Sequence, residues 1–379
     1  MKRQTFALGL LLISGTALAQ GVKTVVISGK FNGDTRGHNK VFIYGTGVKQ
    51  DSAVMTDGNF TFTLPYEKPF MPMFYTEYDK AVKRMYQPFP LLIDEPGTVT
   101  LSEGDITKGL ASMKVGGLKT PTAYGELRRR QNEMYAEVNR GISAKYGADW
   151  YKQGPQNAEA RKAQSEEIER RSALLVGTFI KEHPDSYASV YALTGIKSSV
   201  PPAEVEKMYA LLSPNLRKTE EAKSIAGFLT GLKKSAIGSK VDNFTLNNEL
   251  DKPFSFASLK GKYVVIDFWA SWCGPCKQSF PHMKEVYAKY KGEKFEIYSI
   301  SIDKDKSAWL QGLKDQQLPW LQTLDTKGIS SSGFAVTGVP TTFLVDPNGK
   351  ILLKEVGFDP GGNSPLEKKL EELFGKGNN

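Results

Sequence analysis

Alternating apolar and polar positions dominate the first third of the chain. Residues 60–64, Phe-Thr-Phe-Thr-Leu, place an apolar side chain at every second position, and Asp57-Gly58 supplies a hairpin turn just before them. Further short β-rich runs occupy residues 24–29, 40–44 and 98–101. Several short strands with turns at this spacing predict a sandwich or a small barrel. We therefore expect a β-sandwich-like domain over residues 22–117.

The pattern changes to a helical period between residues 120 and 235. A mainly apolar stripe recurs every three or four positions, on Tyr124, Leu127, Gln131, Met134, Val138 and Ile142. Further helical patterns cover residues 157–182, 203–212 and 220–232. Such stripes more often pack against a neighbouring element than line a cofactor site. The α-helical middle segment has three open interpretations: a spacer, a homodimer contact or a surface that binds a partner.

Strands and helices alternate over residues 236–379. A nearly continuous apolar run at residues 263–268 is typical of a buried central strand, and a helical pattern follows it as far as Tyr290. Short strands are expected ahead of this run, at 244–246 and 254–256. The elements after the helix are a strand at 295–302, a helix at 307–316, a strand pair at 342–345 and 350–355, and a final amphipathic helix at 366–374. This order resembles that of an α/β domain with the thioredoxin-like fold.

The N-terminus has the three parts of a secretory signal. Lys2 and Arg3 give a positive start, residues 6–13 are apolar, and Ala17-Leu18-Ala19 form a small-x-small cleavage site. The alternative is a retained anchor, but the apolar run is too short to span ~30 Å of hydrocarbon. We expect a signal peptide over residues 1–19, cleavage after Ala19, a periplasmic location and a mature chain that does not span the membrane.

Composition and charge narrow the class of protein. The 379 residues allow two or three domains, and 40% hydrophobic with 24% charged residues is ordinary for a globular protein. The formal net charge of +9 raises the question of nucleic acid. The single basic run, Arg128-Arg129-Arg130, lies in a helical pattern where it indicates a solvated face. Because export also disfavours such a partner, we expect no nucleic-acid binding.

The chain has only two cysteines, Cys273 and Cys276. In an oxidising compartment a single Cys-x-x-Cys is either a working redox pair or part of a metal site. Zinc needs at least three protein ligands, and the three histidines of the chain are His38, His183 and His282. Of these, His282 follows Cys276 by six positions on one helix and should point away from the helix start. We therefore expect a redox-active Cys273–Cys276 disulfide, with no metal and no other cofactor.

The spacing assigns each cysteine a role in disulfide exchange. Cys273 should begin the helix, where free amide groups and the helix dipole favour the attacking thiolate. Cys276, one turn further, should resolve the mixed disulfide. Its proton needs an acceptor, and Asp267 lies in the apolar strand, where desolvation raises the pKa of a carboxyl. The alternative for Asp267 is a strand-edge residue paired with a lysine.

Residues 236–379 resemble the TlpA/ResA-type thiol-disulfide oxidoreductases. The matching motifs are the run at 264–276, Val-Val-Ile-Asp-Phe-Trp-Ala-Ser-Trp-Cys-Gly-Pro-Cys, and Gly-Val-Pro-Thr at 338–341. The region ahead of them resembles a β-rich domain of unassigned function that precedes thioredoxin-like domains in exported Bacteroidetes-type proteins. The resemblance implies that Pro340 is cis and that the Val339 backbone binds a substrate chain. Trp272 and Trp269 bracket the site, and we expect Trp272 to shield Cys273 and Trp269 to lie in the core.

The resemblance further implies a reductant of protein disulfides, with cytochrome c maturation as a candidate process. Since the chain has no third cysteine to relay electrons, it must receive them from another protein, which we expect to be an upstream membrane donor. One position departs from the family pattern. Ser279 stands where relatives commonly have Glu, so the proton role rests on Asp267 alone.

Two other hypotheses stay open. A thiol peroxidase shares the fold, but peroxiredoxins carry Thr or Ser three residues before the reactive cysteine, where this chain has Ala270. In the second hypothesis, residues 22–235 bind a partner or a component of the cell envelope, and the redox pair is auxiliary.

Overall fold

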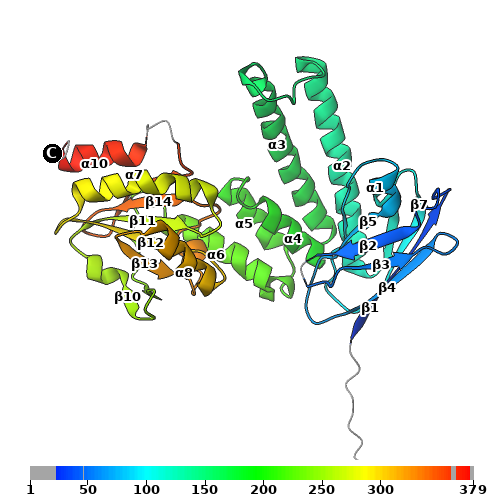
Figure 1. Ribbon diagram of the computed structural model, residues 1–379, viewed down its shortest axis with the longest axis horizontal. Coiled ribbons are helices and arrows are strands. Elements are labelled where there is room, and N and C mark those ends of the chain that lie inside the picture. Colours follow the sequence, from blue (N-terminus) through cyan, green and yellow to red (C-terminus); the bar gives the residue numbers. More distant parts are fainter. Residues whose placement is uncertain (1–22, 46, 360–363, 376–379) are drawn as a thin grey trace, which may run out of the picture. The chain divides into compact units, whose positions relative to one another are not determined.

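The computed structural model describes residues 23–45, 47–359 and 364–375. The expected signal peptide, with its cleavage site after Ala19, lies outside the described residues. The chain divides into two compact units, and the division falls between Arg130 and Gln131, inside a long helix. Figure 1 shows the first unit as mostly strands and the second as helices followed by a sheet that carries helices.

The first unit contains two four-stranded sheets that share one apolar core. Val25 and Ile27 from one sheet and Val41 and Ile43 from the other are fully buried in it, at alternate positions of their strands. The first sheet has the order β4-β1-β7-β8, with β4 (Asn59–Pro65), β1 (Thr24–Asn32), β7 (Gly97–Asp105) and β8 (Lys114–Gly117). The second has the order β3-β2-β5-β6, with β3 (Asp51–Val54), β2 (Lys40–Tyr44), β5 (Met73–Thr76) and β6 (Phe89–Pro90). The predicted β-rich region is confirmed, and a short helix, α1 (Glu77–Ala81), follows β5.

Five helices connect this region to the last sheet. They are α2 (Lys119–Tyr146), α3 (Ala158–Glu182), α4 (Tyr187–Ile196), α5 (Pro202–Leu211) and α6 (Glu220–Lys234). The second half of α2 packs on α3, and Arg171 on α3 binds Glu137 on α2 at 2.9 Å. The helical prediction is confirmed except for α4, which the sequence pattern missed. Six of its ten residues are buried, so α4 shows little of the one-sided stripe that identifies a surface helix.

The rest of the second unit is a seven-stranded sheet in the order β10-β9-β13-β12-β11-β14-β15. The internal strand β11 runs parallel to β12 and antiparallel to β14, and it is buried on both faces. The strands are β9 (Thr245–Asn247), β10 (Pro253–Ser255), β11 (Tyr263–Trp269), β12 (Phe295–Ser301), β13 (Leu321–Leu324), β14 (Thr341–Val345) and β15 (Ile351–Val356). This arrangement confirms the thioredoxin-like expectation.

Helices cover one face of this sheet. Phe280 of α7 (Gly274–Tyr290), Trp309 of α8 (Lys306–Gln316) and Leu370 of α10 (Pro365–Phe374) belong to one buried cluster with residues of β11 and β14. Figure 1 shows α7 and α10 together on this face. On the opposite face, Phe244, Phe256 and Phe334 form a second cluster, and the short helix α9 (Ile329–Ser332) lies just before Phe334.

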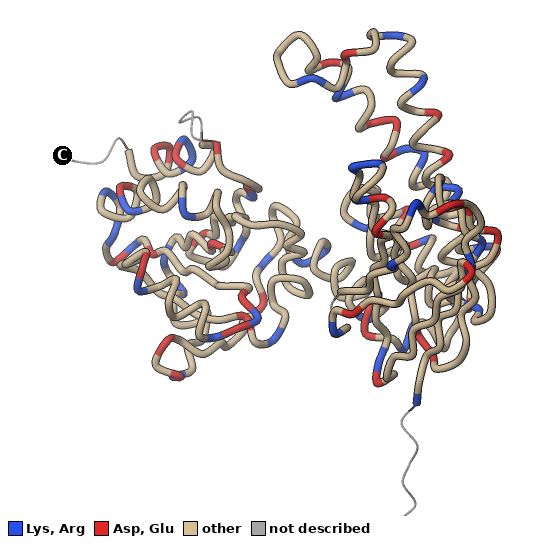
Figure 2. Tube along the Cα trace, turned by 45° about the vertical axis from the view of Figure 1, so that its right-hand side comes forward, with Lys and Arg blue, Asp and Glu red and all other residues tan. Residues whose placement is uncertain are grey.

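Charged residues of both signs are interspersed along the described chain (Figure 2). Within the expected basic run, Arg130 forms an ion pair with Glu126 one helical turn earlier. Further along, Glu167 binds both Arg170 and Arg171, at 2.9 Å and 2.6 Å. These pairs are typical of solvated helix faces. In the part of the chain that the structure describes, no helix combines the length and the apolar content that crossing a membrane requires.

Candidate redox site

The two cysteines form a disulfide at the start of α7. Cys273 is the N-cap residue, and its Sγ accepts a hydrogen bond of 3.1 Å from the backbone N–H of Cys276. Pro275 occupies the first turn, where its missing N–H costs no hydrogen bond. The Cys273 sulfur therefore lies at the positive end of the helix dipole, the place that stabilises a thiolate. Both cysteines are buried in the disulfide form.

A loop that is distant in sequence lies against this sulfur. The carbonyl oxygen of Val339 lies 3.5 Å from the Cys273 Sγ. The peptide bond between Val339 and Pro340 is cis, as the family resemblance implied. Hydrogen bonds hold the loop on both sides of this bond: the Thr341 hydroxyl donates to the Gly338 carbonyl at 2.7 Å, and the Gly357 N–H donates to the Pro340 carbonyl at 2.8 Å. The structure thus brings two sequence-predicted residues, Val339 and Pro340, to the cysteine pair.

Asp267 lies in the internal strand β11 and is only 3% exposed. Its partner in the described chain is the hydroxyl of Ser299, which donates a hydrogen bond of 2.8 Å from the adjacent strand β12. The Trp320 indole N–H donates in turn to the Ser299 oxygen, also at 2.8 Å. Burial raises the pKa of the Asp267 carboxyl from 3.8 to about 6, and the hydrogen bond from Ser299 works in the opposite direction. A carboxyl with this pKa can exchange protons near neutral pH.

A second buried carboxylate, Asp303, holds the segment just before the cysteines. It accepts hydrogen bonds from the Ser271 N–H at 2.9 Å and from the Ser271 hydroxyl at 2.8 Å. The Ser301 hydroxyl adds a third bond at 2.7 Å. Asp303 was not predicted from the sequence, although it lies two residues after strand β12. Because the carboxyl ends of the parallel strands β11 and β12 meet at one edge of the sheet, this position was a signal that could have been used.

Comparison with known proteins identifies the family. Residues 237–354 match the AhpC/TSA family. Over 132 residues the chain is 35% identical to the thiol-disulfide oxidoreductase ResA of a Bacillus cereus strain, and the match covers 35% of this chain and 76% of that protein. The chain belongs to the ResA family of thiol-disulfide oxidoreductases. The resemblance inferred from the two motifs is therefore confirmed, and the enzyme class with it.

Other thiol-disulfide oxidoreductases also match the chain. The ResA of Bacillus thuringiensis subsp. konkukian (strain 97-27) is 32% identical over 150 residues, 40% of this chain and 83% of that protein. Among solved structures, a thiol-disulfide oxidoreductase from Bacteroides fragilis NCTC 9343 is 32% identical, covering 36% of this chain and 99% of the other, with a TM-score of 0.32. The β-rich and helical regions lie ahead of the residues that match the family.

Two tryptophans of this ResA-like site differ in exposure. Trp269 is fully buried, as expected for a core residue, and its indole N–H donates to the Gln322 side chain at 3.2 Å. Trp272, next to Cys273, is 67% exposed. An indole with so much of its surface in water beside a buried sulfur is a candidate contact for a docking protein.

Ser279 and His282 lie on α7 but serve other contacts. The hydroxyl of Ser279, at the position where the family commonly has Glu, donates to the Cys276 carbonyl at 2.8 Å. It therefore completes a local helix contact. The Nε2 of His282 lies 3.7 Å from a carboxylate oxygen of Glu367 on α10, so this imidazole points toward α10.

Proposed function

We propose that this ResA-family protein is an exported reductant of protein disulfides. Cys273 is the attacking thiol and Cys276 the resolving thiol. The observation that carries the proposal is the position of the Cys273 sulfur, at the start of α7 and 3.5 Å from the Val339 carbonyl oxygen. A client disulfide that approaches this sulfur would lie beside the backbone of Val339.

The reaction proceeds in two exchange steps from the dithiol form. The Cys273 thiolate attacks one sulfur of the client, the client disulfide breaks, and one client thiolate leaves. Cys276 then gives up its proton and attacks the Cys273 sulfur, which closes the Cys273–Cys276 disulfide and releases the second client thiolate. Two electrons pass to the client. We assign Asp267 as the acceptor of the Cys276 proton, since its raised pKa of about 6 suits transfer near neutral pH.

Three residues would bind the client chain. Val339 offers its carbonyl oxygen in the strand-addition mode, and Pro340 shapes the loop that presents it. The exposed indole of Trp272 would be covered by the client, and burial of an aromatic ring is a common source of binding energy. Each of these groups lies on a segment that ends at, or faces, Cys273.

The proposal includes a location and an electron source. The signal-like residues 1–19, with cleavage after Ala19, support export to the periplasm. Because the chain has two cysteines and both belong to one pair, reoxidised protein must be reduced again by a separate donor, which we place in the membrane. Cytochrome c maturation is the client process that the family resemblance favours. A homodimer through the β-rich or helical regions stays a sequence-based prediction, and sedimentation analysis of the mature chain tests it.

A trapping experiment tests the proposed function. Cys276→Ser leaves Cys273 able to attack but removes the resolving thiol, so a mixed disulfide with the client should persist and can be identified by mass spectrometry. Cys273→Ser is the matched control, because it keeps one thiol at the same site but lacks the attacking one. Recovery of no disulfide-linked protein with Cys276→Ser would overturn the proposal.

A further inference from the structure

At Gly231, helix α6 packs closely against the backbone of the thioredoxin-like domain. A β carbon at this position would lie 2.3 Å from the carbonyl oxygen of Ser331 and 2.7 Å from the backbone nitrogen of Ala335. Real side chains do not tolerate such distances to backbone atoms. A glycine in the interior of a helix costs about 1 kcal/mol relative to alanine, so its presence here has a packing reason. The reason is contact with the backbone that follows β13.

Ser235 adds a directed bond to the same backbone. It is the C-cap residue of α6, it is only 3% exposed, and its hydroxyl donates to the Phe334 carbonyl at 3.1 Å. Gly231 and Ser235 lie one helical turn apart on one face of α6. Together they hold the backbone between Ser331 and Ala335.

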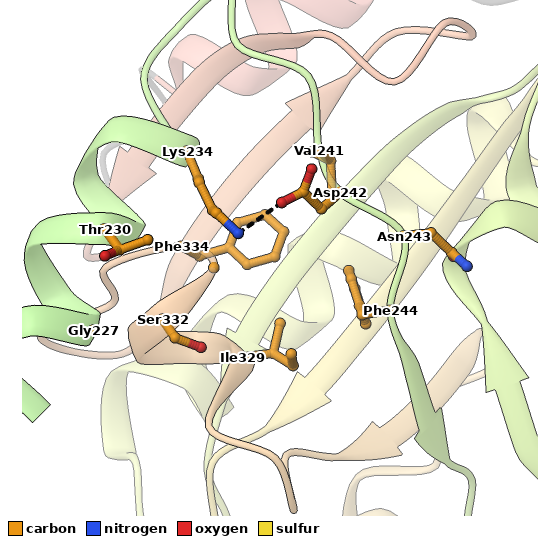
Figure 3. Close-up of a pocket in the computed structure, with 11 residues that line it drawn as sticks. Gly227, Thr230, Lys234, Val241, Asp242, Asn243, Phe244, Ile329, Ser332 and Phe334 are labelled. Carbon is orange, nitrogen blue, oxygen red and sulfur yellow. Dashed lines mark ion pairs between the residues drawn. The ribbon is translucent and has the colours of Figure 1, made fainter. Parts of the chain in front are cut away.

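The contact is close at this end of α6 and looser one turn earlier. A β carbon on Gly227 would lie 3.7 Å from the Ser332 β carbon, which is ordinary van der Waals contact. A cavity of about 360 Å³ opens between this part of α6 and α9. Figure 3 shows Phe334, Ile329 and Phe244 around it, with the Lys234–Asp242 ion pair, 2.8 Å long, at its edge. The close backbone contacts therefore belong to Gly231 and Ser235.

The held backbone leads directly into the loop that faces Cys273. Only residues 336–338 separate Ala335 from Val339. Ala335 has a positive φ of 47°, and its N–H donates to the Ser331 carbonyl at 3.0 Å. A non-glycine residue keeps this left-handed conformation only where its surroundings fix it. Phe334 is anchored as well, with its ring centroid 5.1 Å from those of both Phe268 and Phe343.

Further hydrogen bonds fix the backbone from Ile329 to Val336. The Val336 N–H donates to the Ser330 carbonyl at 2.8 Å, and the Asp325 carboxylate accepts bonds of 2.8 Å from the N–H groups of Ile329 and Ser330. Because only three residues separate Ala335 from Val339, we expect a shift of the Ser331–Ala335 backbone to move Val339 as well.

We propose that α6 supports the loop that binds the substrate chain, the loop containing Val339 and Pro340. Gly231 and Ser235 are positioning residues that set the Val339–Pro340 loop against Cys273, and so determine how well a protein disulfide binds. The inference rests on the proposed reduction of protein disulfides. It gives the last helix of the middle segment a specific role in recognition of a polypeptide chain.

Kinetics of the full mature chain test this role. The variants are Gly231→Ala, which adds a methyl group against the backbone, and Ser235→Ala, which removes one hydrogen bond and adds no bulk. Gly227→Ala is the matched control on the same helix, because its methyl group has room. The probes are insulin as a protein disulfide and 5,5′-dithiobis(2-nitrobenzoate) as a small disulfide.

We expect Gly231→Ala and Ser235→Ala to raise KM for insulin by about tenfold and about threefold, with kcat changed by less than about twofold. Their rate with the small disulfide, and their equilibrium constant with glutathione, should match those of Gly227→Ala. Wild-type kinetics in folded Ser235→Ala and Gly231→Ala would overturn the inference, and so would an equal loss with both probes. If Gly231→Ala does not fold, Ser235→Ala alone decides. A wild-type protein that leaves insulin oxidised would overturn the proposed function itself.

Discussion

Asp303 binds Ser271 twice, through the serine N–H at 2.9 Å and through its hydroxyl at 2.8 Å. Ser271 lies two residues before Cys273. Asp303, just after strand β12, therefore holds the segment that connects strand β11 to the cysteine pair. Asp303 itself is buried, at 4% exposed, and Ser271 is half-buried. The site therefore depends on a residue outside both recognised motifs.

Loss of this carboxylate should loosen the start of α7. For Asp303→Ala we expect the free energy of unfolding to fall by about 2–4 kcal/mol, because the half-buried donors of Ser271 and the buried hydroxyl of Ser301 lose their acceptor. Urea denaturation of the oxidised protein measures this loss. Asp303→Asn is the control, because its amide oxygen still accepts from Ser271, and it should lose less than half as much. Equal losses in the two variants would show that charge, and not the hydrogen bonds to Ser271, is what matters.

Asp267 should make stability depend on pH. Its pKa in the folded protein, about 6, is raised above the ordinary value of 3.8, so folding favours the protonated form. Ionisation of the buried carboxyl therefore destabilises the fold by nothing below about pH 4; this cost grows between about pH 4 and 6 and levels off above pH 6 at about 3 kcal/mol. Asp267→Asn removes this cost.

The variant should match the wild type near pH 4 and exceed its stability by about 3 kcal/mol at pH 8. Urea denaturation at a series of pH values measures the difference. Ser299→Ala removes the hydrogen bond that stabilises the ionised carboxylate, so the fall in stability should still begin near pH 4 but should continue to higher pH in that variant than in the wild type. A constant difference between wild type and Asp267→Asn at all pH values would contradict the assignment.

The same residue should control the second exchange step. If Asp267 accepts the Cys276 proton, Asp267→Asn slows closure of the Cys273–Cys276 disulfide by about 10²-fold at neutral pH. Formation of the mixed disulfide on Cys273 should change by less than about twofold, since that step does not use the carboxylate. Acid-quenched samples analysed by mass spectrometry separate the two steps. Equal slowing of both would assign Asp267 a structural role only.

Peroxide should be a poor substrate. Ala270 stands three residues before Cys273 and is fully buried, so its methyl group offers no hydroxyl to a peroxide at the position where peroxiredoxins carry Thr or Ser. We expect reduced Cys276→Ser protein to consume hydrogen peroxide no faster than an ordinary protein thiol. A peroxide-electrode assay decides, and Cys273→Ser provides the background rate. Rapid consumption that depends on Cys273 would revive the peroxidase hypothesis.

The sequence allowed the core of the site to be predicted because its information is local or carried by motifs. An aspartate inside an apolar strand is conspicuous, and a Cys-x-x-Cys at a strand-to-helix junction has few interpretations. Asp303 and Gly231 were missed for the opposite reason, since their partners are distant in sequence. Gly231 in a helical pattern looks like a local defect, and its purpose becomes visible only when the Ser331 carbonyl lies against it.

Elements were missed where the hydrophobic pattern carries little contrast. Helix α4 is buried on most sides, so the apolar stripe that marks an amphipathic helix is weak. Strands β3, β5 and β13 have four residues each, too few for alternation to stand out from chance. The longer strands β1 and β4, with clear alternation, were predicted without difficulty.

Because of the contact at Gly231, we expect a C-terminal fragment of the protein to be stable only if it includes helix α6. A fragment that starts at residue 236 keeps both cysteines and the whole sheet, but it removes the helix that covers the Ser331–Ala335 backbone and the Phe334 carbonyl. Water would replace the glycine that packs against Ser331 and Ala335. We expect limited proteolysis of the intact protein to spare the junction between α6 and the sheet, and the smallest stable fragment to begin at or before Glu220, the first residue of α6.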